Sequence, residues 1–204
     1  MKNDLLLFHA MPFDQVRREL IHPDPQLSDQ EYLPAYRWLE TQIGFFPHFF
    51  ALGKKDDEEA LRMCGYQCNW RRLLSYGRDA DGKYTYTLCK AGEHLNLVLF
   101  AFSPESMEKL SYSDYMWWNI VLTEVTCDRE VEPVLHRRLF KPSWNPAKWR
   151  SLARKNGHAV QVVCPTLDLS QAKFVYVRNR ATQQALLKQG FENVLVKRIP
   201  VEID

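Results

Sequence analysis

The sequence predicts a single α+β domain that spans residues 1–204. Strand-like and helical segments follow one another without strict alternation, which argues against a doubly wound parallel sheet. Hydrophobic residues make up 46% of the chain and aromatic residues 13%, which excludes a disordered composition. No repeat, low-complexity tract or linker divides the chain. A domain of this length buries roughly 70% of the surface that its unfolded chain exposes.

Apolar runs and alternating aromatic or β-branched residues predict the strands. The first is the apolar run that begins at Leu5, and the fourth includes the run Leu97 to Phe102. The predicted strands cover residues 5–10, 45–52, 83–89, 95–102, 158–164, 173–178 and 194–201.

Capping residues and turn signals predict the helices. Gly44, Gly77 and Gly190 each end a helical segment, and Ser103-Pro104 provides a helix start. Residues 114–125 fit either a helix or a strand. The predicted helices cover residues 13–21, 30–43, 54–76 and 181–189, with two short helices in 133–155 that are broken at Pro142.

The composition indicates a cytoplasmic protein without a membrane segment. The longest apolar run is too short to cross a bilayer, and the N-terminus lacks the apolar length of a signal peptide. Five scattered cysteines are an odd number, which favours reduced thiols over a disulfide framework. Cys64 and Cys68 have helical spacing but no second ligand pair nearby, so no metal site is expected.

Positive charge is concentrated in residues 133–155, although the net charge of the whole chain is only +2. This segment has seven cations, no acid and two tryptophans. A solvated helix face is the plain alternative to a phosphate-binding surface. The candidate nucleic-acid-binding residues are Arg137, Arg138, Lys148, Trp149, Arg150 and Arg154.

Three further features could contribute to a ligand site, although the chain has no phosphate loop, G-x-S-x-G or H-E-x-x-H motif. The first is His9, followed by Ala10, at the end of the opening strand. A histidine beside an apolar run is often a satisfied structural residue. In the functional interpretation its imidazole hydrogen-bonds a ligand at the end of the strand.

The second feature is the aromatic strand that contains Phe50, with the sequence from Arg62 to Tyr66 in the helix after it. Gly65 interrupts that helix at a cost of about 1 kcal/mol relative to alanine. Either a tight helix crossing or the close approach of a ligand would explain it. Phe50 and Tyr66 could stack on a planar heterocycle.

The third feature is Gln161, a polar residue in the middle of an apolar strand. Because strand side chains alternate, Ala159 shares the face of Gln161. A buried glutamine needs a hydrogen-bonding partner or a cavity.

In this order the three features resemble the ADP-ribosyltransferases, most of all the DNA-targeting toxins of the DarT type and their RNA-modifying relatives. The C-terminal third adds a basic, tryptophan-containing helix, a strand, a proline and the strand Val175-Tyr176-Val177. The resemblance implies an ADP-ribosyltransferase-like split mixed β-sheet with flanking helices. It also implies NAD as substrate, a base of DNA or RNA as target, a role as a toxin or in phage defence, and an antitoxin as a further partner.

The resemblance also implies roles for individual residues. His9 and Ala10 match the ligand-binding position of the opening strand, and Phe50 and Tyr66 match neighbours of nicotinamide. Arg62 would pair with a phosphate of NAD.

The sequence departs from the family at the catalytic glutamate. At the corresponding strand it offers Ala159 and Gln161, neither of which carries the negative charge that stabilises an oxocarbenium-like transition state. Position 159 is preferred for the missing glutamate, and Glu124 is a reserve candidate for the carboxylate. The chain would then be a pseudoenzyme or a disarmed toxin.

A non-catalytic nucleic-acid-binding or protein-binding module is the main alternative. In that case the basic segment 133–155 would account for the function by itself. A nuclease ranks last, because paired carboxylates at metal-binding spacing do not occur.

Overall fold

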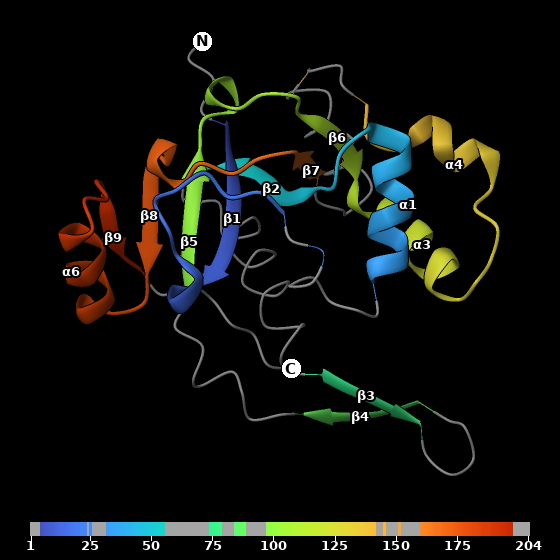
Figure 1. Ribbon diagram of the computed structural model, residues 1–204, viewed down its shortest axis with the longest axis horizontal. Coiled ribbons are helices and arrows are strands. Elements are labelled where there is room, and N and C mark those ends of the chain that lie inside the picture. The colour runs from blue at the N-terminus through green and yellow to red at the C-terminus, as the bar shows by residue number, and fades with distance from the viewer. Residues whose placement is uncertain are drawn as a thin grey trace.

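The computed structural model describes residues 5–23, 25, 32–55, 74–78, 84–88, 97–141, 145, 151 and 160–197. Helices and strands are mixed along the chain, as the sequence predicts, and the principal sheet has seven strands (Figure 1). In spatial order its strands are β6 (Ser111–Asp114), β7 (Val160–Cys164), β2 (His48–Lys54), β1 (Leu5–Pro12), β5 (Leu97–Phe102), β8 (Phe174–Val177) and β9 (Val194–Val196).

The sheet is mixed, because all neighbouring strands are antiparallel except the last pair, β8 and β9. The crossover between these two parallel strands is the helix α6 (Arg180–Lys188). Two other strands, β3 (Leu74–Arg78) and β4 (Tyr84–Leu88), form an antiparallel sheet of their own.

β1 and β2 pair over a short stretch and then separate. Their last register pair joins Phe8 to Ala51. Beyond that point β1 continues against β5 as far as Pro12, while β2 continues against β7 as far as His48. The sheet therefore forks into two limbs, one formed by β1, β5, β8 and β9 and the other by β2, β7 and β6. We call the separation of β1 and β2 the fork.

Helices lie at both ends of the sheet (Figure 1). α6 lies beside β9, and the other helices lie near β6 and β7 at the opposite end. α1 packs against α3, and the stacked rings of Tyr36 and Trp118 contribute to that contact. The remaining described helices are α1 (Leu33–Ile43), α3 (Tyr115–Thr126), α4 (Pro133–Arg138) and the 3-10 turns η1 (Phe13–Gln15), η3 (Pro104–Ser106) and η4 (Leu169–Gln171).

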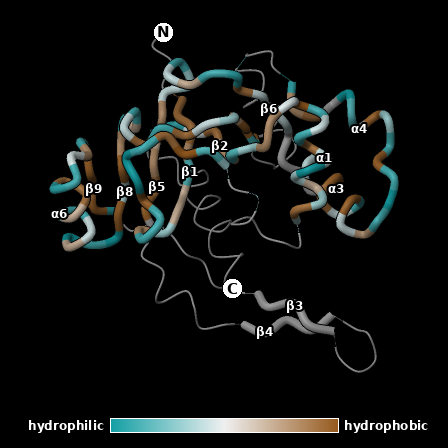
Figure 2. The backbone as a smooth tube through the Cα atoms, viewed as in Figure 1, coloured by the Kyte–Doolittle hydropathy of each residue, from teal (hydrophilic) through white to brown (hydrophobic). Residues whose placement is uncertain are grey.

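The two faces of the sheet bury different clusters, because strand side chains alternate between them. On one face, which we call the α6 face, Phe100 and Val175 pack with Leu186 of α6. On the other, which we call the α1 face, Phe49 and Val163 pack with α1 and α3. Figure 2 shows that β5 and β8 are largely hydrophobic, which fits strands that are covered on both faces.

Each of the seven predicted strands overlaps a strand of the structure, and the helices predicted at 30–43 and 181–189 are confirmed as α1 and α6. Their C-terminal ends were also placed correctly, since Gly44 and Gly190 both adopt the left-handed conformation. The ambiguous segment 114–125 is almost entirely the helix α3. Of the segment 133–155, the structure describes α4 and little beyond it.

Two helix predictions were wrong over part of their length. In 13–21 only the turn η1 forms. The chain instead extends to Ile21, whose backbone pairs with that of Leu167. The helix predicted over 54–76 is wrong where the structure describes this segment. Residue 54 belongs to β2 and residues 74–76 belong to β3, whereas residues 56–73 lie outside the described part. β3 pairs instead with the next strand, β4, and the last register pair joins Arg78 to Tyr84.

Candidate functional site at the fork of the sheet

His9 lies where β1 and β2 separate. Its Nδ1 atom is 2.8 Å from the backbone oxygen of Phe49 on β2, and its ring is 5.2 Å from that of Phe50. Because a carbonyl oxygen can only accept, the Nδ1–H group of His9 is the donor. The imidazole thus continues the contact between the two strands after their backbone pairing has ended.

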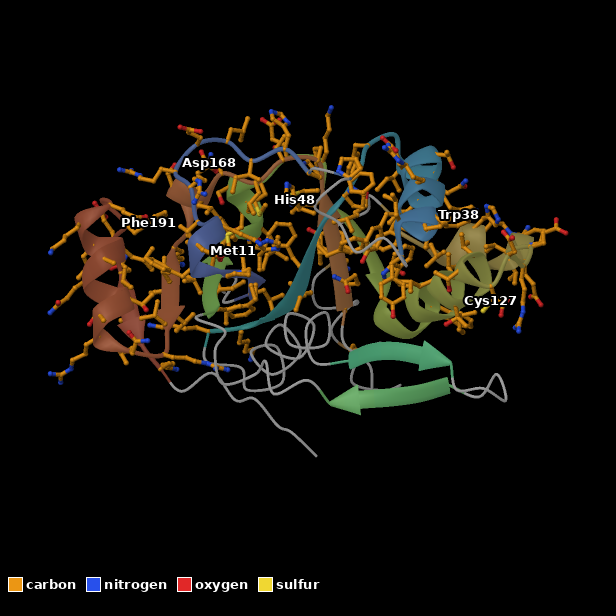
Figure 3. The ribbon with its side chains drawn as sticks, turned by 60° about the horizontal axis from the view of Figure 1, so that its bottom comes forward. Met11, Trp38, His48, Cys127, Asp168 and Phe191 are labelled. Atoms are coloured by element: carbon orange, nitrogen blue, oxygen red, sulfur yellow. The ribbon has the colours of Figure 1, made fainter. Side chains whose placement is uncertain are left out.

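His48 is the second histidine at this site. Its ring meets that of His9 edge-on, with centroids 5.9 Å apart, and its Nε2–H donates to the oxygen of Ile21 at 3.1 Å. Burial, and secondarily the nearby His9, lower the pKa of His48 to about 3. The ring is therefore neutral in the folded protein at physiological pH. Figure 3 shows His48 over the middle of the sheet, between Phe191 on one side and Trp38 on the other.

Gln161 lies on β7, at the other edge of β2. Only 1% of the residue is exposed, and its side-chain amide donates from Nε2 to the backbone oxygen of Phe50 at 2.9 Å. The hydrogen-bonding partner that the sequence requires for a buried glutamine is therefore the backbone of β2. His9 and Gln161 donate to consecutive carbonyl groups of the same strand.

The structure thus brings three of the sequence features together on the adjacent strands β1, β2 and β7. The side chains do not all share one face. His9 and Phe50 lie on the α6 face, whereas Ala10 and Gln161 lie on the α1 face. Arg62, Tyr66 and Ala159, which the family resemblance assigns to the same site, lie outside the described residues.

Glu124, the reserve candidate for the carboxylate, lies on α3 rather than on a strand of the fork. Its Oε1 is 3.5 Å from the guanidinium of Arg129. This ion pair gives the side chain a structural partner away from the strands that carry His9 and Gln161.

The described part of the basic segment is α4, which contacts α1 through His136. The ring of His136 lies edge-on to Trp38, with centroids 4.9 Å apart, and its Nδ1 is 3.2 Å from Oε1 of Gln42. Arg137 is exposed, and Arg138 is the last residue of α4. Lys148, Trp149, Arg150 and Arg154 lie outside the described residues.

Sequence reasoning did not identify a set of cations beside the aromatic residues of β8. Lys55 lies 4.3 Å and Lys173 5.9 Å from the ring centroid of Phe174, and Lys197 lies 5.5 Å from that of Tyr176. Arg178 follows directly after the strand. The only sequence signal was the placement of cations at both ends of the F-V-Y-V strand.

Comparison with protein-family models, curated proteins and solved structures found no match to this chain. Within the described ranges, no three His, Cys, Asp or Glu side chains are grouped in a way that could hold a metal ion. None of the helices that the structure describes is long and apolar enough to cross a bilayer.

The hydrogen bond of Gln161 generates a prediction for Gln161→Glu. A carboxylate cannot donate to the Phe50 carbonyl, so the variant should lose about 2 kcal/mol or more of unfolding free energy at pH 7. Burial raises the pKa of such a carboxyl group, so the loss should grow as pH rises above about 4.3, where the unfolded chain ionises. Urea denaturation at pH 5 and pH 7 measures both effects. Gln184→Glu, at an exposed position of α6, is the control and should change stability by less than about 0.5 kcal/mol. A Gln161→Glu variant as stable as its parent at pH 7 would contradict this assignment.

The lowered pKa of His48 generates a second prediction. Below pH 6.5 the unfolded chain takes up a proton at His48 that the folded protein excludes, so stability should fall as pH decreases from about 6.5 towards 3. The contribution of this residue is about 1.4 kcal/mol per pH unit well below 6.5. His48→Gln keeps an N–H donor for Ile21 and should remove that part of the slope in denaturation between pH 7 and 5. His136→Gln, at an exposed histidine, is the control. An unchanged slope in His48→Gln would show that another group causes the pH dependence.

Proposed function

We propose that this chain is a NAD-binding domain of the ADP-ribosyltransferase type, directed at nucleic acid, whose present sequence lacks the catalytic carboxylate. The observation that carries the proposal is the meeting of three sequence features on β1, β2 and β7. His9 and Gln161 come from opposite ends of the chain, yet both donate to the backbone of β2, at Phe49 and Phe50.

The fork supports the same proposal, because the family resemblance implies a split mixed sheet. The limb that contains β1 and the limb that contains β2 separate at His9. A nucleotide bound at this separation would meet the His9 imidazole and the aromatic ring of Phe50, which lie on one face.

Gln161 is a poor candidate for the position of the missing glutamate. Its side chain is buried, and its amide nitrogen is engaged by the Phe50 carbonyl. An ionised glutamate there would place an acceptor against an acceptor. We therefore assign the missing glutamate to position 159, where the chain has alanine. Alanine cannot stabilise the positive charge that develops on the ribose as nicotinamide leaves.

Ala159→Glu should therefore restore ADP-ribose transfer to nucleic acid. Electrostatic groups that act on the transition state typically contribute a factor of about 10²–10³, so incorporation of label from labelled NAD should rise by at least that much. Gel analysis of DNA and RNA incubated with the variant measures the transfer. Adding His9→Ala to Ala159→Glu should remove the gain.

The unaltered chain provides an independent readout, because NAD binding does not need the carboxylate. At 100 times its dissociation constant NAD should stabilise the fold by about 2.7 kcal/mol. The proposal fails if Ala159→Glu folds normally and transfers no label, and if millimolar NAD also leaves the melting temperature of the unaltered chain unchanged.

A non-catalytic nucleic-acid-binding module is the second candidate, and the exposure of Arg137 favours it. Arg137 lies on a helix that His136 holds against α1, so the cation is presented from a fixed position. Within the described ranges Arg137 forms no ion pair. The rest of the segment 133–155 adds further cations and no acid. Such a surface would bind phosphate groups without reading the base sequence.

If this surface binds nucleic acid, affinity for an oligonucleotide should fall steeply with salt. The expected slope is about −0.7 per contacted phosphate on a single strand and about −0.9 on a duplex. Replacing Arg150 and Arg154 by alanine should reduce the slope by about one to two units. Trp149→Ala should weaken single-strand binding without changing the slope, since base stacking carries no charge. Lys188→Ala, at the end of α6, is the control for a cation elsewhere. A flat salt dependence in the unaltered chain would exclude a nucleic-acid target and leave the NAD site untouched.

A further inference from the structure

Arg178 carries buried polar atoms that have no hydrogen-bonding partner. Its Nε and Nη2 atoms are inaccessible to solvent, and neither donates a hydrogen bond to any group of the structure in the described ranges. Burial lowers the pKa of Arg178. A guanidinium nevertheless remains protonated at physiological pH. Buried donors without partners are rare in folded proteins and indicate a missing acceptor.

A second cation lies at the neighbouring position of the next strand. β8 and β9 are parallel, and their register pairs Val177 with Val196, so Arg178 and Lys197 are the next two residues in line. The backbone continues this pairing, since the nitrogen of Lys197 donates to the oxygen of Val177 at 2.8 Å. Strand neighbours lie about 4.8 Å apart, and like charges at such positions repel each other. An anion between them would remove this repulsion.

The two cations lie at the carboxyl ends of parallel strands, beside the start of α6. Asn179 caps that helix, because its side chain accepts from the nitrogen of Thr182 at 2.8 Å. The first turn contains Arg180 and no acid. In β-α-β units, the carboxyl ends of the strands and the helix N-terminus are a common location for bound anions. Arg178, Arg180 and Lys197 thus place three cations at this end of the crossover, and its one described acid, Glu192, lies near the other end.

We propose that Arg178 and Lys197 form a phosphate-binding site at the carboxyl ends of β8 and β9. The guanidinium supplies two N–H donors in a planar fork, which matches two oxygen atoms of one phosphate group. Lys197 supplies a second positive charge, and its ammonium group also lies over the ring of Tyr176. The site is distinct from the fork, because β5 and β1 lie between β8 and β2 in the sheet. It rests neither on NAD binding nor on the segment 133–155.

A purely structural role for Arg178 would require an acceptor that holds the guanidinium. Structural arginines in proteins are hydrogen-bonded to carboxylates or carbonyl groups. Arg178 has neither in the described part of the chain, although its neighbour Asn179 has a complete capping bond. Of these two consecutive residues after β8, the fold satisfies the side chain of Asn179 and leaves two nitrogens of Arg178 unsatisfied.

Arg178→Leu separates the two roles. If the residue binds a ligand, removing an unpaired buried charge should raise the melting temperature of the protein without ligand. The same variant should lose at least tenfold in affinity for inorganic pyrophosphate, measured by titration calorimetry. Arg178→Lys keeps the charge but not the planar fork, and it should show an intermediate loss. Lys188→Leu, at the opposite end of α6, is the matched control and should bind pyrophosphate like the unaltered chain.

The source of the phosphate is distinguished by competition. If pyrophosphate and a short single-stranded DNA displace each other, and Arg178→Leu weakens both, the phosphate belongs to a nucleic-acid backbone. If only pyrophosphate responds to Arg178→Leu, the site takes a small phosphorylated compound. The proposal is overturned if the unaltered chain binds neither ligand at millimolar concentration. It is equally overturned if Arg178→Leu lowers the melting temperature and leaves affinity for both ligands unchanged, which is the behaviour of a structural arginine.

Discussion

Two consecutive carbonyl groups of β2 accept hydrogen bonds from side chains of the strands on either side. His9 of β1 donates to Phe49, and Gln161 of β7 donates to Phe50. Successive carbonyl groups of a strand point to opposite edges, so one donor is needed on each side. At the fork the backbone ladder between β1 and β2 has ended, and an imidazole substitutes for the missing amide. A buried carbonyl left without a donor would cost about 1–3 kcal/mol, so the separation of β1 from β2 depends on the hydrogen bond from His9.

The register of β1 determines which residues the fork can present. β1 is paired on one edge with β2 and on the other with β5, and both of its faces are buried. A slip of one residue would exchange Phe8 and His9 between the faces and move a polar ring into the cluster that contains Leu99 and Tyr176. The neighbouring strands also have to keep their apolar side chains on buried faces. The packing of these strands therefore fixes the position of His9 beside Phe50. Rigid elements of this kind hold a ligand-binding group more accurately than a loop does.

The sequence predicts the strands well because their apolar runs are local signals, as at β5 and β7. It predicts the ends of α1 and α6 because glycine is favoured where the backbone turns left-handed, as Gly44 and Gly190 do. It fails where a distant segment decides the conformation. The backbone of Leu167, for example, holds Ile21 in an extended segment. The grouping of His9, Phe50 and Gln161 follows from the family resemblance, but their distribution over two faces follows only from the strand register.

Gln161 and Arg178 show how hydrogen-bond satisfaction distinguishes structural from ligand-binding polar residues. The sequence analysis identified Gln161 as a polar residue within an apolar strand, but it did not single out Arg178. Gln161 is buried and satisfied by the Phe50 carbonyl, so the fold itself explains why a glutamine stands there. Arg178 has buried nitrogens that nothing in the described structure accepts, and its neighbour in the next strand is another cation. The folding free energy gains nothing from that arrangement, because a buried charge without a partner opposes folding. An anion that binds only the folded state would make the contribution of Arg178 to the folding free energy favourable. The physical reason for an arginine at the end of β8 is then the ligand and not the fold.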